Sequence, residues 1–192
     1  RVRTAQTGSY ADPVNRRSSG LARRWRIIAL PTVAFLFLGW AWAFASPVGS
    51  AADESFHLTS IWCAWGDSDT CTNTPTLGGV KVPDRIANAS CMAQLGNESA
   101  ACVYALTEET AQSVTVNVGT YPPVYYGVMR AFVGPDISKS VLLMRFANVA
   151  LAAALIAFAL AVTRPVARRA VTLALMACMV PTGIYFIASV NP

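Results

Sequence analysis

The sequence is poor in charge and has almost no histidine: Asp, Glu, Lys and Arg make up 13% of its 192 residues, and His57 is its one histidine. It has no P-loop, no dinucleotide-binding fingerprint and no internal repeat. These absences exclude the nucleotide-binding classes and repeat arrays that such motifs mark. No CxxC pair occurs, and with a single histidine this makes zinc binding the weaker explanation of the cysteines.

Long apolar stretches are what the sequence does contain, at residues 27–46, 141–163 and 171–190. Each has about the 20 residues that a helix needs to cross a hydrocarbon core of roughly 30 Å. The one charge within them is Arg145, close enough to the start of its stretch to snorkel to the membrane surface. None contains an acidic residue, which makes a transporter fragment a weak hypothesis. The sequence predicts an α-helical polytopic membrane protein with three transmembrane helices.

The arginines predict the orientation of these helices. Seven arginines precede the first stretch, and Arg164, Arg168 and Arg169 lie in the turn at residues 164–170. Because cytoplasmic loops carry the excess of Lys and Arg, both clusters are expected inside the cell. Residues 47–140, with nine acidic and four basic side chains, then form a long extracytoplasmic loop of a multi-pass plasma membrane protein.

The basic tail at residues 1–26 has almost no apolar periodicity and is expected to be cytoplasmic and disordered up to about Leu21. The net charge of +5 comes from arginines that flank the membrane and not from a basic folded face. We therefore expect membrane lipid, and no nucleic acid, as a partner of the tail.

A cleavable signal peptide is the rival interpretation of the first apolar stretch, since Ala43-Phe44-Ala45 imitates a cleavage site. Signal peptides have apolar regions of roughly 7 to 15 residues, and this one is longer. Trp40 and Trp42 also suit the aromatic belt at a membrane interface. An uncleaved anchor is favoured.

Four cysteines, Cys63, Cys71, Cys91 and Cys102, lie in the predicted extracytoplasmic loop. An oxidising compartment favours two disulfides among them. Of the three possible pairings we favour Cys63 with Cys71 and Cys91 with Cys102, because short loops close at little entropic cost. The fifth cysteine, Cys178, is interpreted as a small apolar packing residue.

Within the loop the sequence predicts short amphipathic helices and little strand. Residues 50–53 have the S-x-x-D form of a capping box, followed by apolar residues at helical spacing, which predicts a helix on the membrane surface. Residues 67–79 read as a loop by composition. Val114, Val116 and Val118 alternate with polar residues and predict one strand. Pro122 and Pro123 are expected to begin a second short helix.

Four segments of the chain together resemble a known superfamily: ADESFH at residues 52–57, YPPVYY at 121–126, MRFANVALAAAL at 144–155 and ASVNP at 188–192. Their order between apolar stretches is similar to that of the membrane-embedded GT-C glycosyltransferases. The chain looks closest to a related bacterial family of polytopic membrane proteins of unknown function with a similar D-E-x-x-H motif. GT-C enzymes normally have eight or more spans, so three spans indicate the N-terminal part of a longer protein or a small derivative.

The resemblance implies a function and a set of site residues. A sugar would move from a polyprenyl phosphate carrier to an extracytoplasmic acceptor, an envelope glycan or glycolipid, with further membrane subunits as partners. Asp53 would be the catalytic carboxylate that takes the hydroxyl proton of the acceptor, with Glu54 as the second candidate for this role. Arg145, and less directly Arg130, would balance the leaving phosphate. His57 would join substrate binding or a site for a divalent cation.

Each of these residues also has a simpler explanation. Asp53 and Glu54 suit the first turn of any helix, where they complement its dipole. His57 can hydrogen-bond an acid, and Arg145 can be a snorkelling anchor. The alternative function is therefore a non-catalytic membrane subunit or binding module whose loop recognises a partner or a glycolipid.

Overall fold

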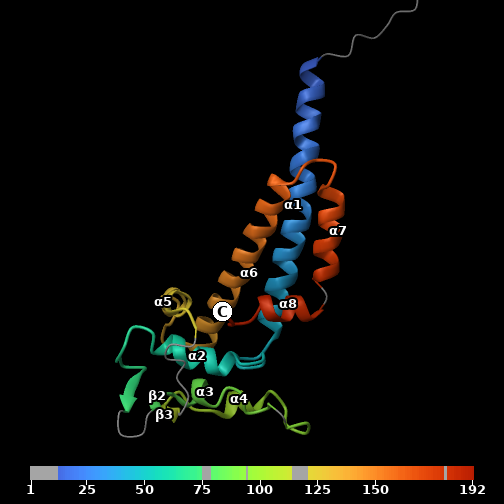
Figure 1. Ribbon diagram of the computed structural model, residues 1–192. Helices are drawn as coiled ribbons and strands as arrows, with labels where there is room; N and C mark the ends of the chain where they lie inside the picture. The colour runs from blue at the N-terminus through green and yellow to red at the C-terminus, as the bar shows by residue number, and fades with distance from the viewer. Residues whose placement is uncertain (1–12, 75–78, 94, 114–120, 180) are drawn as a thin grey trace, which may run out of the picture.

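The computed structural model describes residues 13–74, 79–93, 95–113, 121–179 and 181–192, as a helical bundle with a small domain at one end (Figure 1). The bundle contains α1 (Pro13–Ala45), α6 (Ile137–Val162) and α7 (Arg168–Cys178). The small domain, which we call the loop domain, is residues 46–136. It holds α2 (Glu54–Trp62), β1 (Thr72–Thr74), β2 (Gly79–Pro83), α3 (Asp84–Ala87), α4 (Cys102–Ala105), β3 (Thr110–Ser113) and α5 (Pro123–Arg130).

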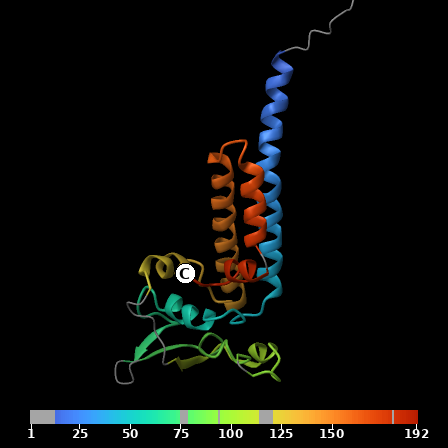
Figure 2. The same ribbon diagram turned by 45° about the vertical axis from the view of Figure 1, so that its right-hand side comes forward.

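Two helices are long and apolar enough to cross a membrane, α1 over Trp25–Ala45 and α6 over Ile137–Val162. The first two predicted transmembrane helices are therefore confirmed. The two helices pack side by side (Figure 1), and in the turned view α7 appears between them (Figure 2). Gly39 of α1 allows a close approach, because a Cβ there would lie 2.6 Å from Val149 Cγ1 of α6. Small residues serve this purpose in membrane helix pairs generally.

The start of α1 differs from expectation. The helix begins at Pro13, so the prediction of disorder up to Leu21 is wrong for the part of the tail that the structure describes. Proline is favoured at the first position of a helix, since its fixed φ suits the helix and its missing N–H is not needed there. The Arg, Leu and Ala residues that follow are strong helix formers.

The third apolar stretch is not one straight helix. It forms α7 and α8 (Pro181–Ile187), which meet at an angle of 82°, so the pair counts as a third span only if it is a broken one. Proline explains the break, because Pro181 has no N–H to continue the ladder of α7 and disfavours helical backbone before it. Gly183 lets the two helices meet, since a Cβ there would lie 2.7 Å from the carbonyl oxygen of Cys178. Cys178 itself is exposed and not packed inside, contrary to expectation.

A three-stranded antiparallel sheet of order β1-β2-β3 lies at the outer end of the loop domain. Thr72 pairs with Lys81, and Val82 pairs with Ala111. The expectation of an unstructured segment at residues 67–79 is therefore wrong at β1. The predicted strand at residues 114–118 lies outside the described residues.

Both predicted disulfides are confirmed as cysteine pairs at bonding distance. Cys63 pairs with Cys71, with Cα atoms 5.4 Å apart, and Cys91 pairs with Cys102 at 6.2 Å. The bridged cysteines are 8 and 11 positions apart in the sequence, so each bridge closes a short loop. By the chain-entropy model a loop of this size contributes about 2 to 3 kcal/mol.

The loop domain has a core of its own, into which α2 is inserted. Leu58, Ile61 and Trp62 are fully buried and pack with residues of the sheet, of α5 and of the first turns of α6. The prediction of an amphipathic helix on the membrane surface is therefore wrong for α2, although a helix does begin in the expected place. The predicted helix after Pro122 is confirmed as α5.

Candidate functional site

Asp53 is the residue before the first turn of α2, and its backbone is unusual. Its φ of 59° and ψ of 3° lie in the left-handed region. No other non-glycine residue of the described chain has a positive φ. Aspartate tolerates this region better than most residues do, but at some cost in energy. The side chain is exposed and makes no capping hydrogen bond to α2. The predicted capping box is therefore wrong, because the cap position falls on Asp53 and not on Ser50.

Glu54, the next residue, points the opposite way into the protein and is fully buried. Its carboxylate accepts four hydrogen bonds, two from Arg145 and two from the backbone. Oε1 accepts from Arg145 Nε at 2.9 Å and from the Val190 N–H at 3.0 Å. Oε2 accepts from Arg145 Nη2 at 2.6 Å and from the Gly49 N–H at 2.9 Å. The two oxygens of Glu54 thus have their accepting capacity occupied.

Arg145 lies in α6 and is 2% exposed, so it does not snorkel to the surface as the sequence allowed. Besides its two bonds to Glu54, it donates to the carbonyl oxygens of Ala43, Ser46 and Pro47 at the end of α1. A guanidinium has five N–H donors, and here all five have a partner. Arg145 therefore has no donor left for a phosphate.

The Glu54–Arg145 ion pair joins four parts of the chain that are far apart in sequence. Glu54 comes from the start of α2 and Arg145 from the third turn of α6, and the backbone at the end of α1 and near the C-terminus bonds to them. A buried pair of this kind fixes geometry even where its net contribution to stability is small. Its consequence here is that the backbone at residues 47–54 is held, and with it the exposed carboxylate of Asp53.

His57 lies one turn into α2 and is 1% exposed. Its Nδ1 shares a hydrogen bond of 3.0 Å with the hydroxyl of Tyr126, and its ring meets the edge of Tyr121 with centroids 5.0 Å apart. Burial lowers the pKa of His57 below its ordinary value of 6.5, while the Asp53 carboxylate and a hydrogen bond with Asn191 raise it. Burial is the larger effect, so His57 is neutral at pH 7 and leaves the charge of Asp53 uncompensated.

The last residues of the described chain hold the loop before α2. Tyr185 of α8 accepts a hydrogen bond from the Ala52 N–H at 2.8 Å and donates one to the Ser50 carbonyl oxygen at 3.0 Å. Asn191 donates to the Ala52 carbonyl oxygen at 3.4 Å. Sequence reasoning assigned no role to Tyr126, Tyr185 or Asn191. The YPPVYY and ASVNP segments were the available signal for Tyr126 and Asn191, but nothing local in them predicts contact with α2.

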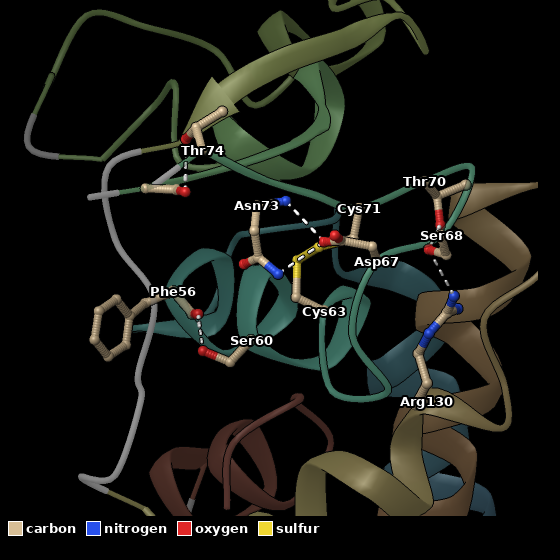
Figure 3. The surroundings of a disulfide bond; sticks show 11 residues. Phe56, Ser60, Cys63, Asp67, Ser68, Thr70, Cys71, Asn73, Thr74 and Arg130 are labelled. Carbon is tan, nitrogen blue, oxygen red and sulfur yellow. Dashed lines mark hydrogen bonds between the residues drawn. A yellow bond between two sulfur atoms is a disulfide. The ribbon is translucent and has the colours of Figure 1, made fainter. Parts of the chain in front are cut away.

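Arg130 is not part of this site. It lies near the other end of α2, beside the Cys63–Cys71 disulfide, where its Nη2 donates to Ser68 Oγ at 3.3 Å (Figure 3). Its guanidinium also lies over the ring of Trp65, 5.8 Å from the centroid. Because α2 has nine residues and a helix rises 1.5 Å per residue, roughly 13 Å separate the two ends. The structure therefore brings His57 close to Asp53 but leaves Arg130 apart.

A cavity of about 170 Å³ lies where the bundle meets the loop domain. The ends of α1 and α6 supply apolar walls, and the polar lining includes Ser46, Arg85, Tyr104, Ser138 and Arg145. Among the cations that line the cavity, Arg85 has an N–H donor available: its Nε is buried without a partner in the described residues, and its ion pair with Glu108 is long at 3.8 Å. Sequence reasoning missed Arg85, which no motif marks.

The described residues do not build a metal site. They contain no group of three His, Cys, Asp or Glu side chains placed to hold a cation. Near Asp53 the other acid is Glu54, whose oxygens are occupied by hydrogen bonds, and His57 Nδ1 is bonded to Tyr126. The donor set thus offers a metal one free carboxylate, which is too few for a protein-held divalent cation.

Comparison with known proteins places most of the chain in a family. The model of a family described as predicted membrane protein (DUF2142) matches residues 36–192, a range that begins within α1 and includes the loop domain, α6, α7 and α8. No curated protein and no solved structure matches the chain.

Proposed function

The chain belongs to the DUF2142 family of predicted membrane proteins, and on that premise we propose that it transfers a sugar from a polyprenyl phosphate carrier to an envelope glycan or glycolipid. The N-terminus is cytoplasmic and the loop domain is extracytoplasmic in this proposal. The arginines in the first part of α1 and in the turn between α6 and α7 support that orientation, because these segments lie at the end of the bundle away from the loop domain.

The observation that carries the proposal is the strained, exposed Asp53 beside a closed ion pair. A non-glycine residue in the left-handed region costs energy, and such residues gather at sites where position matters more than stability. Asp53 is not used as a helix cap, and within the described residues it forms no ion pair. An aspartate that serves neither purpose is free to act on a substrate.

Asp53 is the general base in this mechanism. Its carboxylate takes the proton of an acceptor hydroxyl as that oxygen attacks the anomeric carbon from the side opposite the phosphate. The new bond joins the acceptor oxygen to the sugar, the bond from the sugar to the phosphate oxygen breaks, and polyprenyl phosphate leaves. This inverting course needs one carboxylate as base and no second carboxylate as nucleophile. Glu54 and Arg145 act as positioning residues, since their hydrogen-bonding groups are occupied.

Arg85 is the cation that we assign to the phosphate of the donor. Its cavity lies at the boundary between the apolar helix ends and the polar loop domain, where the phosphate of a membrane-held polyprenyl lipid would be found. Arg145 lines the same cavity and bonds to Glu54, the neighbour of Asp53. One ion pair therefore separates the proposed donor site from the proposed base. No step is assigned to a divalent cation.

The test is Asp53→Asn in the full protein, assayed in membranes supplied with a panel of labelled sugars on polyprenyl phosphate. Transfer should fall by about 10²- to 10⁴-fold, as general-base loss does. The fold should be kept, because asparagine also tolerates the left-handed region. Asp53→Gly should likewise be inactive but more stable by about 1 kcal/mol, since glycine adopts this φ without strain.

The matched control is Asp136→Asn, which makes the same substitution at the exposed N-cap of α6. It should leave transfer unchanged and cost at most about 1 kcal/mol of stability, because Asn caps a helix about as well as Asp and the ion pair lost with Lys139 is at the surface. An Asp53→Asn protein with full transferase activity would disprove the assignment of the base. A wild-type protein that transfers no sugar from any donor of the panel would disprove the proposed reaction.

The non-catalytic alternative also has an observation in its favour. Trp65 is 67% exposed beside the Cys63–Cys71 disulfide, with Arg130 over one face of its ring, and an exposed indole can stack on a sugar. A glycan-binding module would lose affinity with Trp65→Ala and keep it with Asp53→Asn, whereas the transferase would show the larger loss at Asp53.

A further inference from the structure

The bundle has an apolar groove between α1 and α7, which begins at the end away from the loop domain and runs along α7. Two hollows, of about 230 and 620 Å³, share the lining residues Pro31, Ala34, Thr172 and Met176 and so form one continuous groove. Ile156 and Leu160 of α6 lie at its inner wall. The lining is almost entirely aliphatic, and large apolar side chains such as Leu30 and Leu173 are 74% and 67% exposed along it.

Two arginines stand at the open end of the groove, Arg26 of α1 and Arg169 of α7. Both are exposed, and neither forms an ion pair within the part of the chain that the structure describes. α1, α6 and α7 contain no acidic residue that could compensate them. An apolar groove with two uncompensated cations at its open end is complementary to an anionic amphiphile: the groove suits the acyl chain, and the cations suit the anionic headgroup.

Of the three arginines in and beside the turn between α6 and α7, only Arg169 is both exposed and part of the groove lining. Arg168 is 5% exposed and turns back onto the end of α6, where it donates to the carbonyl oxygens of Leu160 and Thr163 at 3.0 Å. It caps that helix and is not available to a ligand. Arg164 is exposed but does not line the groove.

We propose that this groove binds one anionic phospholipid, with an acyl chain between α1 and α7 and its phosphate between Arg26 and Arg169. The length fits, because the groove runs from Arg26 to Leu38, which is roughly 18 Å of helix. One leaflet has about half of the roughly 30 Å hydrocarbon core. In the orientation proposed above, the lipid comes from the cytoplasmic leaflet. A transmembrane helix in the same place would leave both arginines uncompensated.

The experiment measures lipid binding to the purified full chain by native mass spectrometry, with dioleoylphosphatidylglycerol and dioleoylphosphatidylcholine as probes. Phosphatidylglycerol should bind more tightly to the wild type. Removing one arginine should weaken its binding about fivefold, and Arg26→Gln with Arg169→Gln about 30-fold, since each cation near an anionic headgroup contributes to that extent. Binding of phosphatidylcholine should change less than twofold.

Two further variants decide between the groove and a general surface charge. Arg164→Gln removes a charge from the same turn without touching the groove, and it should change phosphatidylglycerol binding less than twofold. Ala34→Phe fills the place where the two hollows join, and it should weaken phosphatidylglycerol binding at least tenfold while both arginines remain. The proposal is overturned if the wild type binds the two lipids equally, if Arg164→Gln weakens binding as much as Arg169→Gln, or if Ala34→Phe has no effect. The wild-type comparison stands even if a variant does not fold, and none of these results depends on the transferase proposal.

Discussion

Replacing Arg145 by methionine tests the role of the buried ion pair most directly. The substitution leaves the Glu54 carboxylate buried without a countercharge and removes the donor from the Ala43, Ser46 and Pro47 carbonyl groups. Breaking a buried pair by removing one partner costs about 3 to 5 kcal/mol. For a chain of this size each kcal/mol lowers the unfolding midpoint by about 2 to 4 °C, so we expect a fall of roughly 6 to 20 °C.

The measurement is unfolding in mixed micelles, followed by tryptophan fluorescence, since Trp62 is fully buried in the loop domain core. Arg164→Met is the matched control, because Arg164 is exposed in the turn between α6 and α7, and it should change stability by less than about 0.5 kcal/mol. Glu54→Gln should also be destabilising. The amide NH2 of glutamine would replace one carboxylate oxygen and would then face two N–H donors in place of accepting from them.

The double variant, Glu54→Gln with Arg145→Met, should cost less than the sum of the two single variants, because it leaves no buried charge. It should not return to wild-type stability, since the three carbonyl groups near the end of α1 still lack a donor. Additive single effects, or an Arg145→Met protein as stable as wild type, would refute the reasoning that this pair holds the segment before α2.

Two further predictions concern His57 and the topology. The lowered pKa of His57 means that the unfolded chain binds a proton that the folded chain does not as the pH falls below 6.5. Stability should therefore be fully present above pH 6.5 and decrease below it. His57→Gln should flatten this dependence between pH 7.5 and 5.5, and an unchanged slope would assign the acid sensitivity to another group. For the topology, in a Cys178→Ala background, a membrane-impermeant thiol reagent applied to intact cells should label Thr74→Cys and miss Val166→Cys in the 89% exposed turn. The reverse pattern would place Asp53 in the cytoplasm and remove the transferase proposal.

Local sequence was enough to predict the elements whose cause is local. The spans of α1 and α6 follow from about 20 consecutive apolar residues, which is a property of composition. The pairing of Cys63 with Cys71 and of Cys91 with Cys102 follows from short closing distances along the chain. The start of α5 follows from the backbone of Pro123. No distant residue is needed for any of these.

The sequence could not predict the environment of the candidate site. Asp53 and Glu54 are adjacent and look alike in a helix-start pattern, but one is exposed in the left-handed region and the other is fully buried. Their difference depends on Arg145, which is 91 residues from Glu54, and on Tyr185, which is 133 residues from Ala52. Periodicity and propensity describe near neighbours only, so they could not assign the buried role to Glu54.

The sequence by itself determined which segments are long and apolar enough to span a membrane, how the loop domain is cross-linked, and that acids stand where α2 begins. The tertiary structure alone decided that the third apolar stretch breaks at Pro181, that Arg145 is an internal ion-pair partner and not a snorkelling anchor, and that Arg85 and not Arg130 lines the cavity. The physical reason is that backbone preference and hydrophobicity act residue by residue. The partner of a buried charge is fixed only when distant segments pack together, because a buried charge must find its countercharge there.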